Sequence, residues 1–534
     1  MSQTWLDLHD IQGNIVKAYG RYGFPKGRYV FFRVWDADAG RQFVRELVPD
    51  ITTSAPWRDK GSGSGSSPVP EVTTNIAFTY HGLRELGVPR VSLQSFPDEF
   101  AMGMKARQDI LGDDGPSAPE SWDPIWRGEE AVHIFVAIHG QDEACLERRY
   151  QQVAELALRV PGGVQLLTGH RGPDGKEDLP FQPATAIYID GAPSSKEHFG
   201  YTDGIGDPFF KGTGAHEANL MGGGKVTGLP ANTRAGWAPL ETGEFLLGYR
   251  DEAFECPEAP VPKLLSHNGT FMVYRKLHEN VGSFDDYLEH VGREFPGGKE
   301  ELAAKFAGRW RNGAPITKFP SEAEACAFAD EWLKEKQAIA TATTKAERDA
   351  AKQRFSVLNE QFSAFDYDQD GAGGRCPAGA HIRRANPRGA LEFGQKGAFE
   401  TPGALSNRRR IIRRGLPYGD ASTKRRDDGD HGIIFMALNA SIRRQFEFVQ
   451  QQWMNYGNDF KLANDKDPLL GNQGRNEQGA GTGRMVIQSG EQDARPPFFC
   501  SKIPRFVETR GGDYFFVPSL TALRMIGEGS IDPT

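Results

Sequence analysis

The sequence has few of the features that mark a secreted, membrane-bound or metal-cluster protein. Five cysteines are scattered over 534 residues, and no two form a CxxC pair, which argues against a zinc ribbon and against a disulfide framework. No apolar run approaches the ~20 residues that a membrane-spanning helix needs. The first residues lack the basic segment followed by an apolar segment that is typical of a secretory signal peptide, and they contain no twin arginine. We therefore expect a cytoplasmic protein with reduced thiols and no membrane partner.

An excess of positive charge is also lacking. The chain has 63 Lys and Arg against 71 Asp and Glu, a formal net charge of −8, which argues against nucleic acid or an anionic membrane as a partner. The Arg-rich run at 408–414 is a local exception without a basic face around it. Hydrophobic residues make up 38% and charged residues 25%, as in globular proteins, and the length predicts two domains.

The first half of the chain alternates between strand and helix patterns. Runs rich in aromatic and β-branched residues predict strands, and apolar residues spaced three or four apart predict helices. The expected strands are 28–34, 75–80, 131–138 and 164–168, and the expected helices are 37–47, 81–86 and 142–158. Strand–helix–strand, given twice, is the ferredoxin-like order.

The second half repeats this theme less regularly. The residue patterns predict strands at 244–249, 270–275, 432–437 and 514–517, and helices at 299–310, 441–453 and 519–526. Ser283 followed by Asp286 predicts the capped start of one more helix. The charged, Ala-rich stretch 325–355 predicts a solvent-exposed helical insertion.

Three segments combine residues that suit the chemistry of a flat cofactor. Residues 376–388 (CPAGAHIRRANPR) place His381 between small residues and arginines, and a neutral imidazole is a good ligand for haem iron. Residues 200–208 (GYTDGIGDP) place Asp203 among glycines, and residues 409–419 (RRIIRRGLPYG) contain Arg413. Each has a simpler interpretation: a hydrogen-bonded histidine, an Asp-Gly turn and a surface salt bridge.

Together, and in this order, these segments resemble the GxxDG motif, the proximal-histidine segment and the distal-arginine segment of the dye-decolourising (DyP-type) haem peroxidase family. Residues 10–15 (DIQGNI) and 443–448 (RRQFEF) resemble the opening motif and the late helix of that family. The resemblance implies an α+β fold of two ferredoxin-like domains with antiparallel sheets, of the dimeric α+β barrel type. We expect domains at 1–195 and 196–534, with the haem in the second and the insertion near 325–355.

The resemblance also implies a role for each matched residue. Asp203 would be the distal acid–base group that moves a proton during peroxide cleavage. Arg413 would contact the cofactor and stabilise the negative charge that develops as the O–O bond breaks. Gly204 would let the backbone approach the cofactor, and His381 would be the axial ligand and the metal-binding residue. Asp207 is interpreted as a cap or turn residue.

The resemblance therefore implies one haem b per chain, with hydrogen peroxide and phenols, dyes or other small aromatic reductants as substrates. The absence of CxxCH predicts that the haem is not covalently linked. Whether the protein forms a homo-oligomer is left open. A non-catalytic haem-binding or haem-handling protein is the alternative, and it would have no use for Asp203 and Arg413 together. A purely structural α+β protein would need none of these residues.

One position departs from the family pattern. Family members often place an aspartate just before the late helix, where it binds the other ring nitrogen of the proximal histidine, but here Ser441 occupies that place. A backbone carbonyl or another acid could serve instead. Without an anionic partner, His381 would donate less electron density and the iron potential would be less negative.

Overall fold

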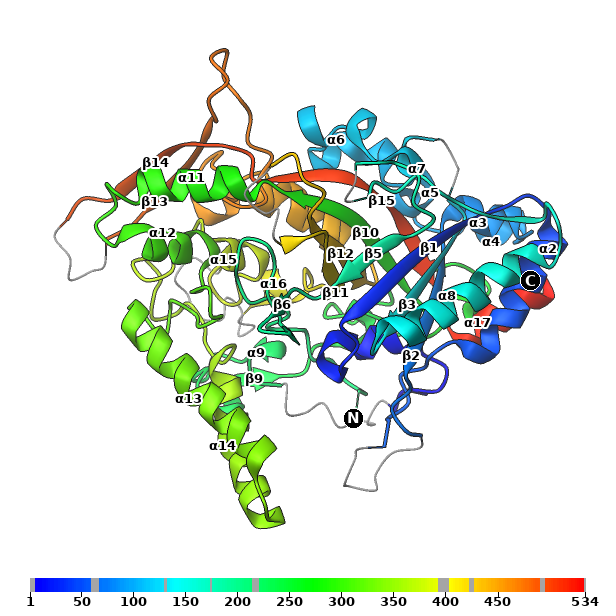
Figure 1. The fold of residues 1–534 in the computed structure, drawn as a ribbon, viewed down its shortest axis with the longest axis horizontal. Helices are drawn as coiled ribbons and strands as arrows, with labels where there is room; N and C mark the ends of the chain where they lie inside the picture. The colour runs from blue at the N-terminus through cyan, green and yellow to red at the C-terminus, as the bar shows by residue number, and fades with distance from the viewer. Residues whose placement is uncertain are drawn as a thin grey trace.

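The computed structural model describes residues 5–58, 67–128, 132–172, 175–213, 220–391, 403–421, 427–489 and 495–532. Its centre is one antiparallel sheet of nine strands, with helices packed against it (Figure 1). The architecture is α+β, as expected from the sequence.

The N-terminal part of the sheet is ferredoxin-like. Its strands lie side by side in the order β2 (Val72–Phe78), β3 (Ile134–Gly140), β1 (Lys26–Val34) and β4 (Val164–Leu166), and β5 (Gln182–Thr185) also pairs with β1. The crossover helices are α2 (Ala37–Leu47) and α8 (Glu143–Leu158). The strands and helices predicted in this half are all present, within a few residues of the expected ends.

The C-terminal part repeats the same strand order. Counted along the chain, both parts are arranged second, third, first, fourth, here as β11 (Ile412–Tyr418), β12 (Gly432–Asn439), β10 (Thr270–Glu279) and β15 (Val507–Val517). This repetition is the expected pair of ferredoxin-like units. The boundary between the domains at residue 195 stays a prediction.

Three features join the halves into one body. Strand β15 pairs with β2 through Phe516 and Phe78, which makes the sheet continuous. Lys276 of β10, whose side chain is 1% exposed, lies 2.8 Å from the carboxylate of Asp123 and 3.2 Å from that of Asp430. The last helix, α17 (Leu520–Glu528), then packs on α2 of the first half.

Three predictions in the second half were wrong. Residues 244–249 are not a strand, because Glu244 ends a short 3-10 turn and its buried carboxylate binds Arg444. Helix α11 (Val281–Val291) begins before Ser283, whose hydroxyl donates to Asp427 and does not cap a helix. The predicted helix at 441–453 is π-helical, in two segments, Arg443–Glu447 and Val449–Met454.

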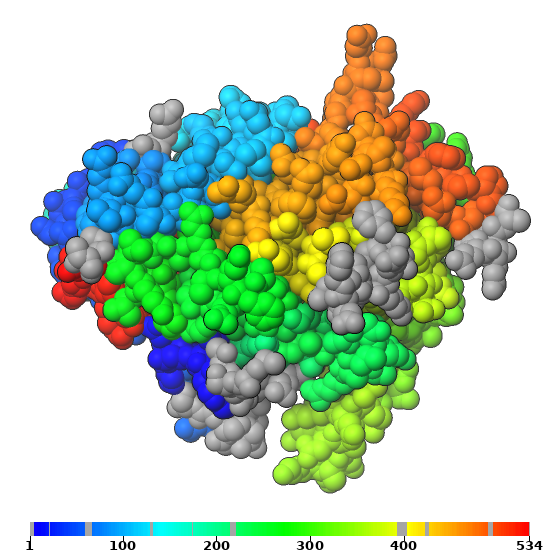
Figure 2. Space-filling view, turned by 180° about the vertical axis from the view of Figure 1, so that it is seen from behind, coloured from blue at the N-terminus to red at the C-terminus, as the bar shows by residue number. Residues whose placement is uncertain are grey.

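The predicted helical insertion is a hairpin of two helices, α13 (Glu322–Thr341) and α14 (Lys345–Gln361). Ser321 and Thr344 cap their N-termini, each with a glutamate three residues on. The hairpin projects from the body of the molecule (Figures 1 and 2). Its sides are therefore mostly exposed, as the charged composition predicts.

The buried Lys276 gives a test of how the halves are held together. Lys276→Met leaves two buried carboxylates without their cation, so we expect the free energy of unfolding to fall by about 3–5 kcal/mol. Denaturant unfolding measures the change. Lys299→Met, which removes an exposed cation beside Glu289, is the control and should change stability by less than about 0.5 kcal/mol. Equal midpoints for Lys276→Met and the wild type would contradict this account.

Candidate active site

The loop that carries Asp203 depends on its glycines. Gly200 and Gly204 have φ angles of +92° and +76°, a left-handed region that side chains with a Cβ rarely adopt. The backbone N–H of Asp203 donates to the carbonyl of Ser195 at 2.7 Å, which holds the residue at the neck of the loop. A Cβ added to Gly204 would meet nothing within 4 Å, so there is open space beside Asp203.

Arg413 reaches this loop from strand β11. Its Nη1 donates to Oδ1 of Asp203 at 2.6 Å, and its Nη2 donates to the carbonyl of Ile205 at 3.0 Å. Arg414 is next along the strand and points to the opposite face, where it binds Asp207 at 3.0 Å. The structure thus brings Asp203 and Arg413 together and shows Asp207 as the ion-pair partner of the neighbouring arginine.

The ion pair sets the charge state of Asp203. Removal from water raises the pKa of its carboxyl group. The Arg413 guanidinium and the Gly204 N–H lower this pKa by a larger amount, so that the net pKa is below the ordinary value. The pKa of Arg413 is raised, chiefly by Asp203. Both side chains keep an open side, with 39% of Asp203 and 37% of Arg413 exposed. A carboxylate that is ionised and accessible is suited to accept a proton.

His381 is the first residue of a short helix, α15 (His381–Ala385). Its Nδ1 lies 3.1 Å from Oδ2 of Asp467, and its side chain is 27% exposed. Within the described ranges its Nε2 makes no hydrogen bond. The charge of His381 contributes to the lowered pKa of Asp203, so the two residues belong to one region of the protein.

The surroundings of Asp467 favour its ionised form. Its side chain is fully buried, and its Oδ1 accepts the N–H groups of Leu469 at 2.9 Å and Leu470 at 2.8 Å. Burial raises the pKa of this carboxyl, but His381 and Arg384 lower it more, and the net pKa lies below the ordinary value. His381 therefore has a carboxylate partner. In the sequence Asp467 lies in a loop beside Asp465, and no motif distinguishes the two.

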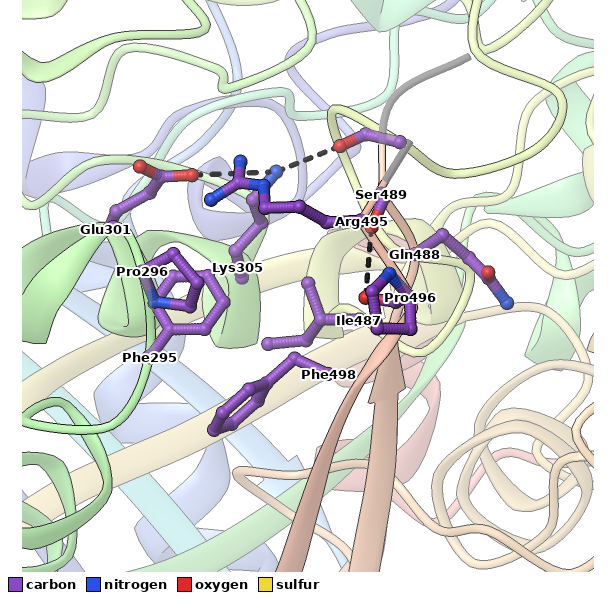
Figure 3. A pocket seen from close by; sticks show the side chains of 12 residues that line it. Phe295, Pro296, Glu301, Lys305, Ile487, Gln488, Ser489, Arg495, Pro496 and Phe498 are labelled. Atoms are coloured by element: carbon purple, nitrogen blue, oxygen red, sulfur yellow. Dashed lines mark hydrogen bonds and ion pairs between the residues drawn. The ribbon is translucent and has the colours of Figure 1, made fainter. Parts of the chain in front are cut away.

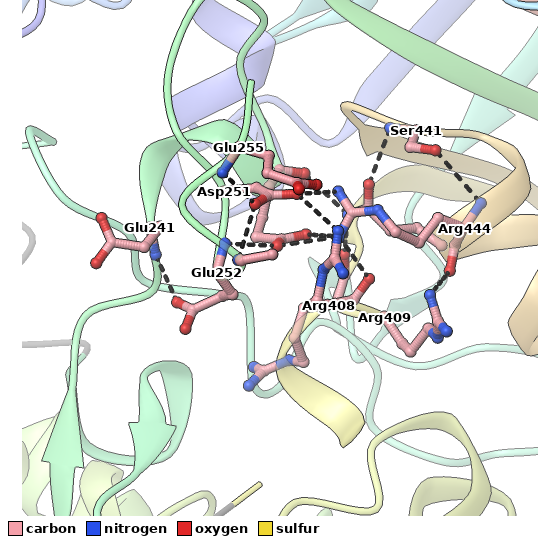
Figure 4. Close-up of polar contacts among 12 residues, drawn as sticks. Glu241, Asp251, Glu252, Glu255, Arg408, Arg409, Ser441 and Arg444 are labelled. Carbon is pink, nitrogen blue, oxygen red and sulfur yellow. Dashed lines mark hydrogen bonds and ion pairs between the residues drawn. The ribbon is translucent and has the colours of Figure 1, made fainter. Parts of the chain in front are cut away.

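Of the alternatives left open by Ser441, the structure supports another acid as the partner of His381. Ser441 lies beside Arg444, whose N–H its hydroxyl accepts at 3.4 Å, in a network of buried charges around Asp251 (Figure 4). It makes no contact with His381. The acid that binds the histidine comes from the loop after the π-helical segments, and the missing aspartate at 441 does not leave His381 without an anionic partner.

The other arginines of the run at 408–414 have structural partners. Arg408 forms an ion pair with the carboxylate of Asp251 at 3.0 Å. Both side chains are labelled in Figure 4. Arg409 stacks on the ring of Phe448, with its guanidinium carbon 3.9 Å from the ring centre. Arg410 is buried and donates to two backbone carbonyls. Of this run, Arg413 is the arginine whose side chain meets Asp203.

A separate cavity of about 210 Å³ lies between helix α12 (Gly298–Ala307) and the hairpin of β13 (Gly483–Ile487) and β14 (Phe498–Ile503) (Figure 3). Phe295 and Phe498 form its apolar side, and Lys305 lies at its polar side. The Lys305 ammonium donates to the carbonyls of Gly374 and Arg375, just before the His381 segment. None of the predicted site residues lines this cavity.

Other site types are not found in the described residues. They contain no group of three or more His, Cys, Asp or Glu side chains that could hold a metal ion. Among the helices described, none has the length and apolar character required to cross a membrane.

Comparison with known proteins agrees with the fold and with the motifs. Residues 10–171 match the sequence model of the DyP dimeric alpha+beta barrel domain. The chain is 27% identical to the dye-decolorizing peroxidase msp1 of Mycetinis scorodonius, over 98% of this chain and 88% of that protein. It is also 27% identical to the multifunctional dye peroxidase DyP2 of an Amycolatopsis species, over 97% of this chain and 96% of that one.

Solved structures extend the likeness to the whole fold. The structure of an ancestral D-type dye decolorizing peroxidase is 26% identical and superposes with a TM-score of 0.70, covering 98% of this chain and 99% of that chain. A dye-decolorizing peroxidase in complex with 2,6-dimethoxyphenol, 23% identical, has the same fold with a TM-score of 0.69, over 98% and 100% of the two chains. The domain match, the relatives aligned over nearly their full length and the shared fold all support a likeness of this chain to the dye-decolourising (DyP-type) peroxidases.

Proposed function

We propose that this peroxidase binds one haem b per chain through His381 and reduces hydrogen peroxide with Asp203 as acid–base group and Arg413 as charge-stabilising group. The observation that carries this proposal is the Asp203–Arg413 pair, joined at 2.6 Å with both side chains still partly open. A surface salt bridge would need neither the glycine-dependent loop nor the strand that bring the pair together. A non-catalytic haem protein would need neither residue.

The residues fit a haem. His381 has one ring nitrogen on Asp467 and the other without a hydrogen bond among the described residues, so the second nitrogen would be available to bind the haem iron. The open space beside Gly204 would let a flat group approach the backbone. Bound haem would supply the iron at which peroxide is cleaved and the redox capacity to take electrons from reductants.

Asp203 is suited to move the proton. Its Oδ1 is held by Arg413, so Oδ2 is the oxygen that accepts the proton of hydrogen peroxide and returns it to the oxygen that leaves as water. Its lowered pKa keeps the group ionised before peroxide binds. Arg413 carries a fixed positive charge beside this oxygen and would stabilise the negative charge of the departing oxygen without reorganisation.

We propose phenols, dyes and similar small aromatic molecules as reductants. Support comes from the full-length relatives, which are named dye-decolorizing or dye peroxidases, and from the related structure that holds 2,6-dimethoxyphenol. The cytoplasmic location stays a prediction of the sequence.

Replacement of the acid–base group tests the first step. Asp203→Asn should lower the second-order rate constant for peroxide consumption by about 10²–10⁴-fold, and Arg413→Leu by about 10²–10³-fold. Because the pKa of Asp203 is lowered, the wild-type rate should persist at acidic pH and decline only once the pH falls below the ordinary pKa of an aspartate. Stopped-flow traces measured from pH 3 to 8 show both effects. Wild-type rates in both variants would refute the assignment.

Removal of the axial ligand tests haem binding. His381→Ala should lose most of the haem on gel filtration, measured as the ratio of Soret to protein absorbance, because the imidazole is the proposed iron ligand. Asp203→Asn is the matched control and should keep the wild-type ratio. A fully loaded His381→Ala protein with an unchanged spectrum would show that the ligand is another residue.

The buried Asp467 gives a third prediction. Asp467→Asn removes the negative charge that polarises His381, so the Fe(III)/Fe(II) potential should become less negative and activity should fall by about 10–100-fold. Spectroelectrochemical titration measures the potential. Ser441→Ala is the control, because Ser441 does not contact the histidine, and it should leave the potential unchanged. A shift in the control without one in Asp467→Asn would reverse the assignment.

A further inference from the structure

The loop that presents Asp203 closes around a second acidic side chain, Glu197. Residues 196 and 202 face each other in an antiparallel bridge, so residues 197–201 form a closed loop. Within it, one carboxyl oxygen of Glu197 accepts the N–H of Phe199 at 2.8 Å, and the other accepts the N–H of Tyr201 at 2.6 Å. Both oxygens are thus acceptors, and the conformation of the loop depends on them.

A third acidic residue, Glu279, links this loop to the sheet by a hydrogen bond. Glu279 is the last residue of β10 and is 4% exposed. Its Oε2 accepts the N–H of His198 at 3.3 Å, and its carboxyl group is within hydrogen-bonding reach of that of Glu197. In the part of the chain that the structure describes, no ion pair joins Glu279 to a cation. Two carboxyl groups in such contact do not both ionise, because their charges repel.

We propose that Glu197 and Glu279 share one proton, and that this proton fastens the loop carrying Asp203 to the end of strand β10. The two glutamates are positioning residues, since they act on the reaction through Asp203. This inference rests on the proposed role of Asp203 for its effect on activity, but not for its effect on the loop.

The hydrogen bonds assign the proton to one side of the pair. Glu197 uses both oxygens to accept backbone N–H groups, so Glu279 is the donor between the two carboxyls. The remaining oxygen of Glu279 accepts the His198 N–H, and every polar atom of the pair is then satisfied. Burial, followed for Glu279 by repulsion from Glu197, raises the pKa of both groups, so the pair keeps its proton at acidic pH.

The surrounding charges agree with this assignment. The groups that act on the pair or respond to its charge are Lys196, His198, Tyr201, Asp203, Arg311 and Tyr418. The two permanent cations among them, Lys196 and Arg311, interact with Glu197, which favours its ionised form. Asp203 repels a charge on either glutamate. Closure of the loop should therefore be favoured at low pH and weaken as the pH rises through the raised pKa values.

Glu279→Gln tests the shared proton directly. The amide of glutamine can donate to Glu197 and accept from His198, as the protonated acid does, but it does not titrate. We expect the backbone amides of 196–204 in the wild-type holoenzyme to lose protection by about tenfold or more between pH 5 and 9, after correction for intrinsic exchange. In Glu279→Gln their protection should stay constant. Hydrogen exchange with mass spectrometry measures this loop without reference to turnover.

Two further variants sharpen the experiment. In Glu197→Gln only one side-chain oxygen remains to accept the two N–H groups of Phe199 and Tyr201. The amides of the loop should therefore be less protected from hydrogen exchange at every pH. Glu508→Gln neutralises a carboxylate near the same end of the sheet, where it binds Asn280 and Arg510, and it should behave as the wild type. The proposal is overturned if the wild-type loop shows the same protection from pH 5 to 9, or if Glu279→Gln shows the same loss as the wild type.

Activity gives the second measurement. Because the loop loosens as the pair loses its proton, the wild-type rate constant for peroxide should fall at alkaline pH. In Glu279→Gln this fall should move to higher pH. If Asp203→Asn reacts with peroxide at the wild-type rate, the proposed function fails, while the exchange experiment still decides whether the proton holds the loop. If the exchange is as expected but the alkaline limb does not move, the loop is held by the proton without an effect on the reaction, and the positioning role is overturned.

Discussion

The antiparallel pairing of β10, β12 and β11 determines where the groups of the site lie. Strand β11 is held on β12 from Ile412 to Tyr418, which sets Arg413 on the face that meets Asp203. Strand β10, in the middle of this part, ends at Glu279 beside the base of the same loop. Without these pairings the arginine and the aspartate, 210 residues apart in the chain, would have no fixed relation.

The site uses its carboxyl groups in two opposite ways. Asp203 and Asp467 face cationic or donor groups, and these outweigh burial, so that the pKa of each is lowered and the charge is kept. Glu197 and Glu279 face each other, and burial and repulsion raise their pKa values, so that a proton is kept. The protein thus places ionised and protonated carboxyl groups close together, and the difference comes from the partners of each group and not from its residue type.

The carboxylate partner of His381 comes from a different place in the chain than the motif comparison indicates. The carboxylate that binds His381 comes from Asp467, although the motif comparison directs attention to Ser441. Asp467 is held by the N–H groups of Leu469 and Leu470, and its own N–H donates to Met454 at the end of the π-helical region. A rigid loop therefore supplies the anion that a residue before the helix would otherwise supply.

Much of the fold could be predicted from the sequence, since strands such as β1 and β3 and helices such as α2 and α8 carry strong local periodicity. Strand β11 was missed because it contains Gly415 and Pro417, which are poor strand formers, and pairing with β12 decides its conformation. Residues 244–249 are as apolar as a strand, but Glu244 is drawn into an ion pair with Arg444, which is distant in the chain.

The sequence by itself indicated an α+β fold through its local patterns. Its short motifs, through their resemblance to the DyP-type family, implied two ferredoxin-like domains and Asp203, Arg413 and His381 as candidate site residues. Only the tertiary structure decided that Asp203 and Arg413 form a pair, that Asp467 is the partner of His381 and that Glu197 meets Glu279. The reason is physical: each of these contacts joins a loop to another loop or to the end of a strand or helix, where the residues carry no local periodicity. Their meeting is set by how the strands pair and not by any spacing along the chain.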